Sequence, residues 1–175
     1  MSMLKIVCED KARQYIKDIE DWTISQGGVW KGFKLTKVEF DWSPHRVTSR
    51  GGMYSSGPGI NIAMQRYGSS YSSVKAYRVH EYKSFDKDPD IGGFFTDNKM
   101  DGLKMILCHE IAHASQFYLY KVNYFRDTPH GETFKTIYRK IRKQFLNSTL
   151  PDQEPLREEF CKQATDFTKL AMSEL

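Results

Sequence analysis

The sequence predicts an α+β fold in a single domain, and three observations lead to this prediction. The order of patterned segments is one helix, then a group of short strands, then further helices. No internal repeat, low-complexity tract or linker divides the chain. With 175 residues, 39% of them hydrophobic, the chain can bury a sizeable core without disulfide bonds. We therefore expect a small antiparallel or mixed sheet flanked by helices.

The N-terminal segment predicts a helix followed by a strand. In residues 9–28, Ile16, Ile19 and Trp22 recur at helical spacing, and Gly27-Gly28 provides a stop signal. Residues 33–42, FKLTKVEFDW, alternate between apolar and polar side chains, which is typical of a half-buried strand.

A hairpin is predicted next. Short β-like pieces at 53–54 and 60–62 flank Ser-Ser-Gly-Pro-Gly, a turn-forming run. Residues 74–85, VKAYRVHEYKSF, resemble a further strand, and a polar loop with Pro89 and Gly92-Gly93 follows.

The C-terminal half is predicted to be helical. A helix is expected from about Asn98 or Asp101 to about Tyr118, a second over 130–146, and an amphipathic helix over 156–175. We assign residues 1–150 to the domain and 151–175 to a terminal helix packed on or beside it. By default, such a helix covers the core.

Charge and cysteine content narrow the function classes. A net charge of +4 permits acidic partners without requiring them. Cys8, Cys108 and Cys161 are too few and too widely spaced for a disulfide framework or a zinc ribbon. No signal peptide and no run of 18 apolar residues is present. We expect a soluble monomer in a reducing cytoplasm, with no membrane partner.

The most informative stretch is GLKMILCHEIAHASQFYL, residues 102–119, because its apolar helix contains His109, Glu110 and His113. Histidines at i and i+4 lie on one helix face and can bind one metal ion. Glu110 is rotated from that face by about 100 degrees, so it is placed to reach a zinc-bound water rather than the ion. Zinc lowers the pKa of such a water to about 7, and the carboxylate takes its proton. The pattern predicts one catalytic Zn²⁺ ion.

A third protein ligand is needed, and the sequence offers His130 and Glu132. The metzincin pattern fails, because Gln116 and Leu119 stand where it needs glycine and histidine. Thr128-Pro129 resembles an N-cap and first helical residue, which would fix His130 in the first helical turn. We favour His130 as the ligand and Glu132 as an acid behind the ligands or in solvent.

The run HEIAH, followed by HGETFK at the start of a helix, resembles the SprT-like metallopeptidases, and SRGGMYSSGPGINIA is similar to their Gly-Gly hairpin. The resemblance spans about residues 10–145. It implies a zincin-like fold, zinc on His109, His113 and His130, and Glu110 as the general base. It also implies hydrolysis of peptide bonds in proteins that are bound or crosslinked to DNA.

Two features depart from the family pattern. Residues 66–97 are longer than the family core needs, and the C-terminal zinc ribbon found in bacterial members is absent, since only Cys161 lies beyond the active helix. Recruitment to DNA by that ribbon is therefore not expected. The single-domain layout would suit a phage or another mobile element, in which case the compartment is the host cytoplasm.

The sequence also predicts a DNA-binding surface and a substrate-binding strand. Each has an ordinary structural interpretation as its alternative. Phosphates of single-stranded or junction-containing DNA could contact basic residues after the third ligand, although charge runs are usually solvated helix faces. These residues are Lys135, Arg139, Lys140, Arg142 and Lys143. The strand Ile60-Asn61-Ile62 could pair with an extended substrate, or it could be an ordinary sheet edge. Tyr118, Tyr120, Tyr124 and Tyr138 are candidates for stabilising the oxyanion.

The main alternative function is a non-catalytic module in which zinc pins two helices together for DNA or protein binding. Structural zinc sites are normally closed by four protein ligands. A fourth ligand is hard to find in this sequence, and such a module gives Glu110 no role, so the sequence favours a zinc endopeptidase.

Overall fold

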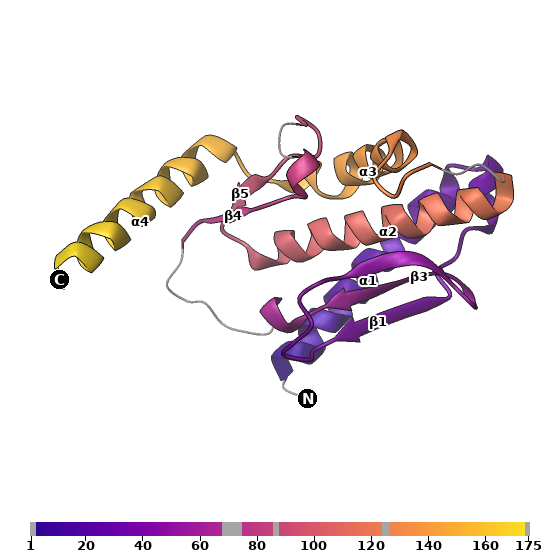
Figure 1. Ribbon diagram of the computed structural model, residues 1–175, viewed down its shortest axis with the longest axis horizontal. Coiled ribbons are helices and arrows are strands. Elements are labelled where there is room, and N and C mark those ends of the chain that lie inside the picture. The colour runs from indigo at the N-terminus through magenta and orange to yellow at the C-terminus, as the bar shows by residue number, and fades with distance from the viewer. Residues whose placement is uncertain (1–2, 68–74, 86–87, 124–126, 174–175) are drawn as a thin grey trace.

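A long helix, α2 (Lys99–Asn123), runs through the middle of the molecule, between a three-stranded sheet and α3 (Glu132–Phe145). Figure 1 shows this arrangement in the computed structural model, which describes residues 3–67, 75–85, 88–123 and 127–173. The helix α1 (Met3–Ser25) also packs against α2. The predicted α+β class is confirmed, and α2 is the element that all the layers share.

The sheet has the order β1-β3-β2 and is mixed. The strand β3 (Gly57–Ala63) pairs in parallel with β1 (Lys37–Asp41) and antiparallel with β2 (Arg50–Tyr54). The predicted hairpin is confirmed, since β2 and β3 are joined by Ser55-Ser56.

The predicted substrate strand is wrong, because Ile60-Asn61-Ile62 lies in the central strand. Hydrogen-bonding partners on β1 and β2 occupy both sides of β3. Ile60 and Ile62 are each 0% exposed. A substrate cannot be added to a strand whose two edges are already paired. The strand edge that borders the active helix belongs to β2.

The core forms between the sheet, α1, α2 and α3. The first helix ends as predicted, with Gly27 and Gly28 in the left-handed region at φ of 71° and 55°, which glycine adopts without a Cβ penalty. Buried apolar side chains from the four layers then meet along α2. They include Ile16, Ile19, Ile60, Ile62, Leu103, Leu107, Ile111, Phe134 and Ile141.

A second, smaller sheet is formed by β4 (Tyr77–Val79) and β5 (Phe94–Thr96), which pair antiparallel. The strand predicted over 74–85 is therefore shorter than expected. After Val79 the chain turns inward, because the Glu81 carboxylate pairs with the buried Arg142 of α3. Short 3-10 helices connect the larger elements at Gly28–Gly32, Gln65–Tyr67, Lys83–Phe85 and Asn147–Thr149.

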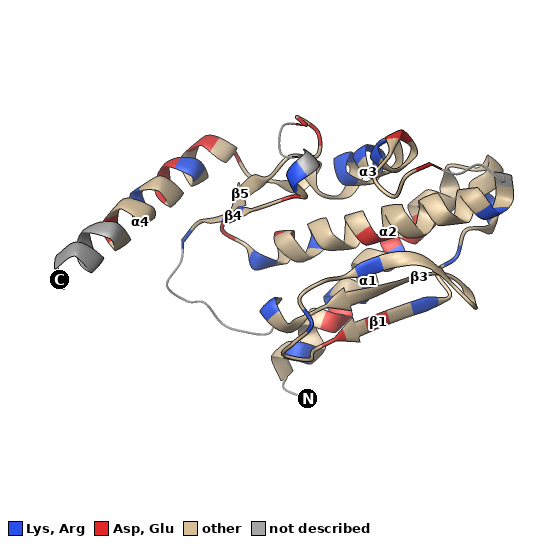
Figure 2. Cartoon of the chain, in the orientation of Figure 1, with Lys and Arg blue, Asp and Glu red and all other residues tan. Residues whose placement is uncertain are grey.

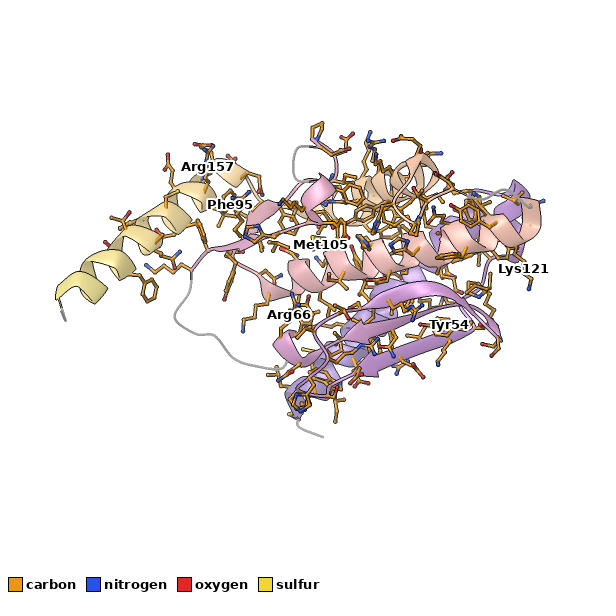
Figure 3. All side chains as sticks on the ribbon, in the orientation of Figure 1. Tyr54, Arg66, Phe95, Met105, Lys121 and Arg157 are labelled. Carbon is orange, nitrogen blue, oxygen red and sulfur yellow. The ribbon has the colours of Figure 1, made fainter. Side chains whose placement is uncertain are left out.

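The terminal helix α4 (Gln153–Ser173) packs on the small sheet rather than over the main core. Phe160 contacts Phe95 with ring centroids 5.5 Å apart, and the Gln153 amide bonds to both backbone groups of Phe95. Figure 3 labels Phe95 and Arg157 at this junction. None of the α4 side chains that the structure describes is buried.

In the parts of the chain that the structure describes, no helix combines the length and apolar character needed to cross a membrane.

Candidate metal centre and active site

His109 and His113 lie one turn apart on α2 and are almost fully buried, with 9% and 8% of their surfaces exposed. Apolar neighbours such as Leu107 and Ile111 anchor the helix in the core. The i and i+4 spacing puts both imidazoles on the face of α2 that meets α3. The local helix therefore fixes two of the three donors.

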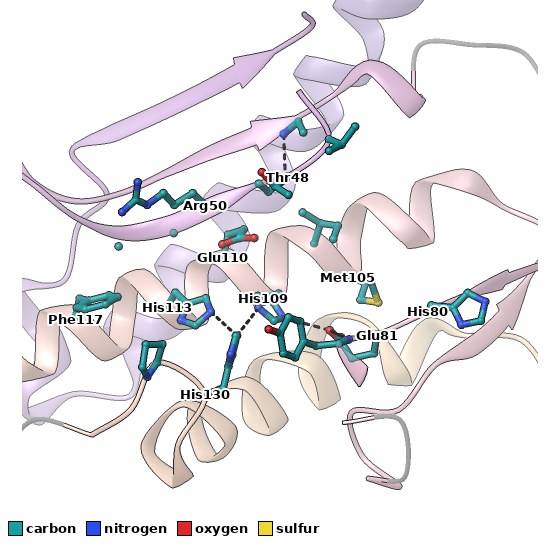
Figure 4. Close-up of a pocket in the computed structure, with 18 of the residues that line it drawn as sticks. Thr48, Arg50, His80, Glu81, Met105, His109, Glu110, His113, Phe117 and His130 are labelled. Atoms are coloured by element: carbon teal, nitrogen blue, oxygen red, sulfur yellow. Dashed lines mark hydrogen bonds and ion pairs between the residues drawn. The ribbon is translucent and has the colours of Figure 1, made fainter. Parts of the chain in front are cut away.

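The third histidine comes from the segment between α2 and α3. His130 Nε2 lies 3.0 Å from His113 Nε2 and 3.3 Å from His109 Nε2. One donor atom from each residue lies within 4.8 Å of the others. Figure 4 shows the three rings converging on one point.

This geometry fits a metal ion. Zinc–nitrogen bonds of about 2.0–2.1 Å in a tetrahedron place two nitrogens about 3.3 Å apart. The observed separations of 3.0 and 3.3 Å match that value. Neutral imidazoles carry one proton each, so a ring that keeps its proton on Nδ1 presents a lone pair at Nε2. Three converging Nε2 atoms therefore make a site suited to a cation with imidazole ligands.

Glu132 does not join this cluster. Its side chain is 78% exposed, and its carboxylate pairs with Lys135 at 2.8 Å. The structure thus brings together His109, His113 and His130, the set that the sequence favours.

His130 is held by a turn and not by the predicted helical first turn, because α3 begins at Glu132. The predicted N-cap, Thr128, is wrong. The Asp127 carboxylate instead accepts hydrogen bonds from the backbone N–H groups of Thr128 and Thr133, at 2.7 and 3.2 Å. A Cβ on Gly131 would lie 2.1 Å from the Asp127 carboxylate, so a larger residue at 131 would displace the carboxylate that holds this turn.

The environment favours the neutral form of His113 and His130. Burial, aided by repulsion from His109 and His130, lowers the pKa of His113 to about 3. Burial and His109 likewise lower the pKa of His130. Phe134 stacks on His113 with ring centroids 4.2 Å apart, which contributes to this apolar wall. Neutral imidazole is the form that binds a metal ion.

Glu110 lies on a different face of α2 and points toward β2 (Figure 4). It is 7% exposed, and burial raises the pKa of its carboxyl group, while a hydrogen bond from the Gly51 backbone N–H opposes that rise. The carboxylate and the histidine cluster line the same cleft. Glu110 is therefore placed beside the three histidines without being one of their group.

The cleft has a volume of about 860 Å³ and lies between β2 and the segment around His80–Tyr82. On β2, Met53 lies opposite Pro58, which has no N–H, so this pair lacks the ladder hydrogen bonds. The backbone N–H and C=O groups of Met53 therefore point away from β3. Those of Gly51, two residues earlier on the same strand, point in the same direction.

Sequence reasoning missed the residues that wall the cleft opposite β2. Tyr82 packs on His130 with ring centroids 4.6 Å apart and ring planes tilted by 34°. Phe85, which does not line the cleft itself, meets the same histidine ring edge-on at 5.5 Å. The Glu81 side chain, 3% exposed, lies 3.3 Å from His109 Nδ1. Nothing in the alternating run RVHEYK distinguishes Glu81 from its polar neighbours, so only the fold identifies it.

The tyrosines proposed from the sequence for oxyanion stabilisation have other contacts. Tyr138 donates its hydroxyl to Glu81, Tyr120 donates its hydroxyl to the Asp127 carbonyl, and Tyr118 stacks on Trp30. Tyr124 lies outside the described residues. In contrast, Tyr82 is 56% exposed and lines the cleft.

The five predicted DNA-contact residues do not form one exposed surface, although Figure 2 shows that Lys and Arg gather on α3. Arg142 has only 2% of its side chain exposed and pairs with Glu81, so its inclusion is wrong. Arg139 pairs with Asp88 at 2.6 Å, and Lys135 pairs with Glu132. Lys140 and Lys143 are exposed.

Comparison with known proteins gives one match. Residues 93–155 match the model of the SprT-like family. The matched segment runs from β5 to the start of α4 and contains Glu110 and all three clustered histidines. No curated protein and no solved structure matches the chain.

Proposed function

Because residues 93–155 match the model of the SprT-like family, we propose that the chain is a zinc-dependent endopeptidase of this type. The observation that carries this proposal is the convergence of three histidine Nε2 atoms beside a buried glutamate in an open cleft. Three protein ligands leave a position for water or substrate, as in catalytic zinc sites.

His109, His113 and His130 would hold the ion. Bound there, zinc supplies Lewis-acid chemistry that polarises the substrate carbonyl and makes water more acidic. The contribution of the protein is to hold the three histidine donors in place before the ion arrives. Packing of His113 and His130 against Phe134 and Phe85 supports this role.

Glu110 would act as the general base. It takes the proton of the attacking water and later delivers it to the leaving amine. Its position supports this role, because it follows His109 directly and faces the side of the cleft that β2 borders. A carboxylate that is buried beside the cleft, rather than bonded to the ion, is free to exchange protons.

The substrate would bind in an extended conformation along β2. The outward backbone groups of Met53 can pair with a peptide, and such pairing has little sequence preference. This mode suits an enzyme that cleaves many different proteins. Proteins bound or crosslinked to DNA are the substrates we propose, with Lys140 and Lys143 of α3 available for DNA contact.

The deciding experiment compares the wild-type protein with Glu110→Gln, both loaded with one zinc ion. Each is incubated with a DNA-binding protein, with and without single-stranded DNA. We expect cleavage by the wild type, stimulated by DNA, and a loss of about 100-fold or more in the variant with zinc content and melting temperature unchanged. Equal behaviour of the two proteins would instead favour the alternative, a zinc-stabilised binding module without catalysis.

A further inference from the structure

We propose that Glu81 is a positioning residue for His109. Its carboxylate accepts the Nδ1 proton of His109 and so keeps the Nε2 lone pair directed at the metal site. This inference rests on the proposed zinc site, but it concerns a residue outside the segment that matches the family.

The first observation is the contact itself. Glu81 Oε1 lies 3.3 Å from His109 Nδ1, with only 3% and 11% of the two side chains exposed. A buried carboxylate is costly unless its oxygens have partners, so a placement of this kind needs a cause. The opposite nitrogen of the same ring, Nε2, faces His130.

The second observation is that Glu81 is itself held firmly. Its Oε2 atom accepts hydrogen bonds from Arg142 Nη1 at 3.1 Å and from the Tyr138 hydroxyl, while Oε1 accepts the Tyr82 backbone N–H at 2.9 Å. Arg142 also donates to the carbonyl oxygens of Ile91 and Gly92, at 2.8 and 2.6 Å. Through these hydrogen bonds, the buried arginine links Glu81, Ile91 and Gly92 of the 81–92 segment to α3. It thereby holds the Glu81 carboxylate next to His109.

These contacts determine a tautomer. An ionised carboxylate can only accept hydrogen bonds, so the His109 nitrogen that faces it must carry the proton. Neutral imidazole has one N–H, so Nε2 then has none and can bind a metal ion. Groups that orient ligand histidines in this way typically change metal affinity 10- to 100-fold when they are removed.

Glu81→Gln tests this directly, because the glutamine keeps the size of the side chain but has only one accepting oxygen. The charged Arg142 attracts that oxygen, which turns the amide NH₂ toward His109 Nδ1. His109 must then accept at Nδ1 and carry its proton on Nε2, the wrong tautomer for binding the ion. Asp88→Asn is the matched control, because Asp88 also links the segment to α3, through Arg139.

The experiment records imidazole ¹⁵N–¹H correlation spectra of the histidine-labelled, metal-free protein and measures zinc affinity against a competing chelator. We expect the Nδ1–H tautomer of His109 in the wild type and in Asp88→Asn. In Glu81→Gln we expect the Nε2–H tautomer and zinc affinity about 10- to 100-fold weaker.

Two results would overturn the inference. One is an Nε2–H tautomer of His109 in the metal-free wild type, which decides the matter even if Glu81→Gln fails to fold. The other is a folded Glu81→Gln with wild-type tautomer and zinc affinity. Neither readout uses proteolysis, so a protein that binds zinc through this arrangement but cleaves nothing would contradict only the proposed function.

Discussion

Gly51 of β2 lies so close to Glu110 of α2 that a Cβ atom on Gly51 would be 1.9 Å from the Glu110 carbonyl oxygen. The same glycine also provides a backbone hydrogen bond to the Glu110 carboxylate. The clash would involve helix backbone, which cannot rotate away as a side chain can. This contact sets the distance between the edge strand and the candidate base.

Gly51→Ala should therefore push β2 away from α2. We expect a loss of about 3 kcal/mol in the free energy of unfolding and a clear loss of any cleavage activity, measured by chemical denaturation and by a protease assay. Gly52→Ala is the control, since a Cβ there meets only the Phe117 ring at 3.7 Å. A harmless Gly51→Ala would mean that the strand and the helix are not held this closely in solution.

Removal of the metal should lower thermal stability. Zinc at 100 times its dissociation constant stabilises a folded protein by about 2.7 kcal/mol, which corresponds to roughly 5–10 °C for a chain of this size. The measurement is a melting curve with zinc and with chelator. His130→Ala should abolish the difference, whereas His80→Ala should retain it, because His80 lines the cleft outside the histidine cluster. A shift that survives His130→Ala would place the ion elsewhere.

Met53→Pro should weaken binding of an extended substrate. Proline removes the outward N–H of Met53 without removing a ladder hydrogen bond, because Met53 lies opposite Pro58. We expect kcat/KM to fall about tenfold, the effect of losing roughly one hydrogen bond, with the melting temperature nearly unchanged. Met53→Ala keeps the N–H and should retain activity. Equal losses in both variants would assign the effect to the side chain.

Lys140 and Lys143 should account for most of the salt dependence of DNA binding on α3. For single-stranded DNA, each phosphate contact contributes about 0.7 to the slope of log affinity against log salt concentration. The double alanine variant should therefore reduce that slope by about 1.4, as measured by fluorescence anisotropy across a salt series. Arg157 and Lys162, two exposed cations on α4, supply the control pair. An unchanged slope would remove α3 from the DNA interface.

Local patterns in the sequence predicted much of the fold. Helical spacing located α1, α2 and α3, and the Ser-Ser-Gly-Pro-Gly turn located the β2–β3 hairpin. Strand order was not predictable, because alternation shows which face of a strand is buried and not which strands lie beside it. For that reason the sequence points to β3 as the substrate strand, although the edge that faces the cleft belongs to β2.

The sequence by itself determined the pair of histidines on α2 and the glutamate between them, since i and i+4 geometry is a property of any α-helix. It also favoured His130 over Glu132 as the third ligand. Only the tertiary structure decided that Arg142 is buried and that Glu81 lies beneath His109. Arg142 and Glu81 are 61 residues apart, and side chains so distant meet only through the packing of whole elements. Chain folding, and not local spacing, therefore sets the environment in which the histidines would act.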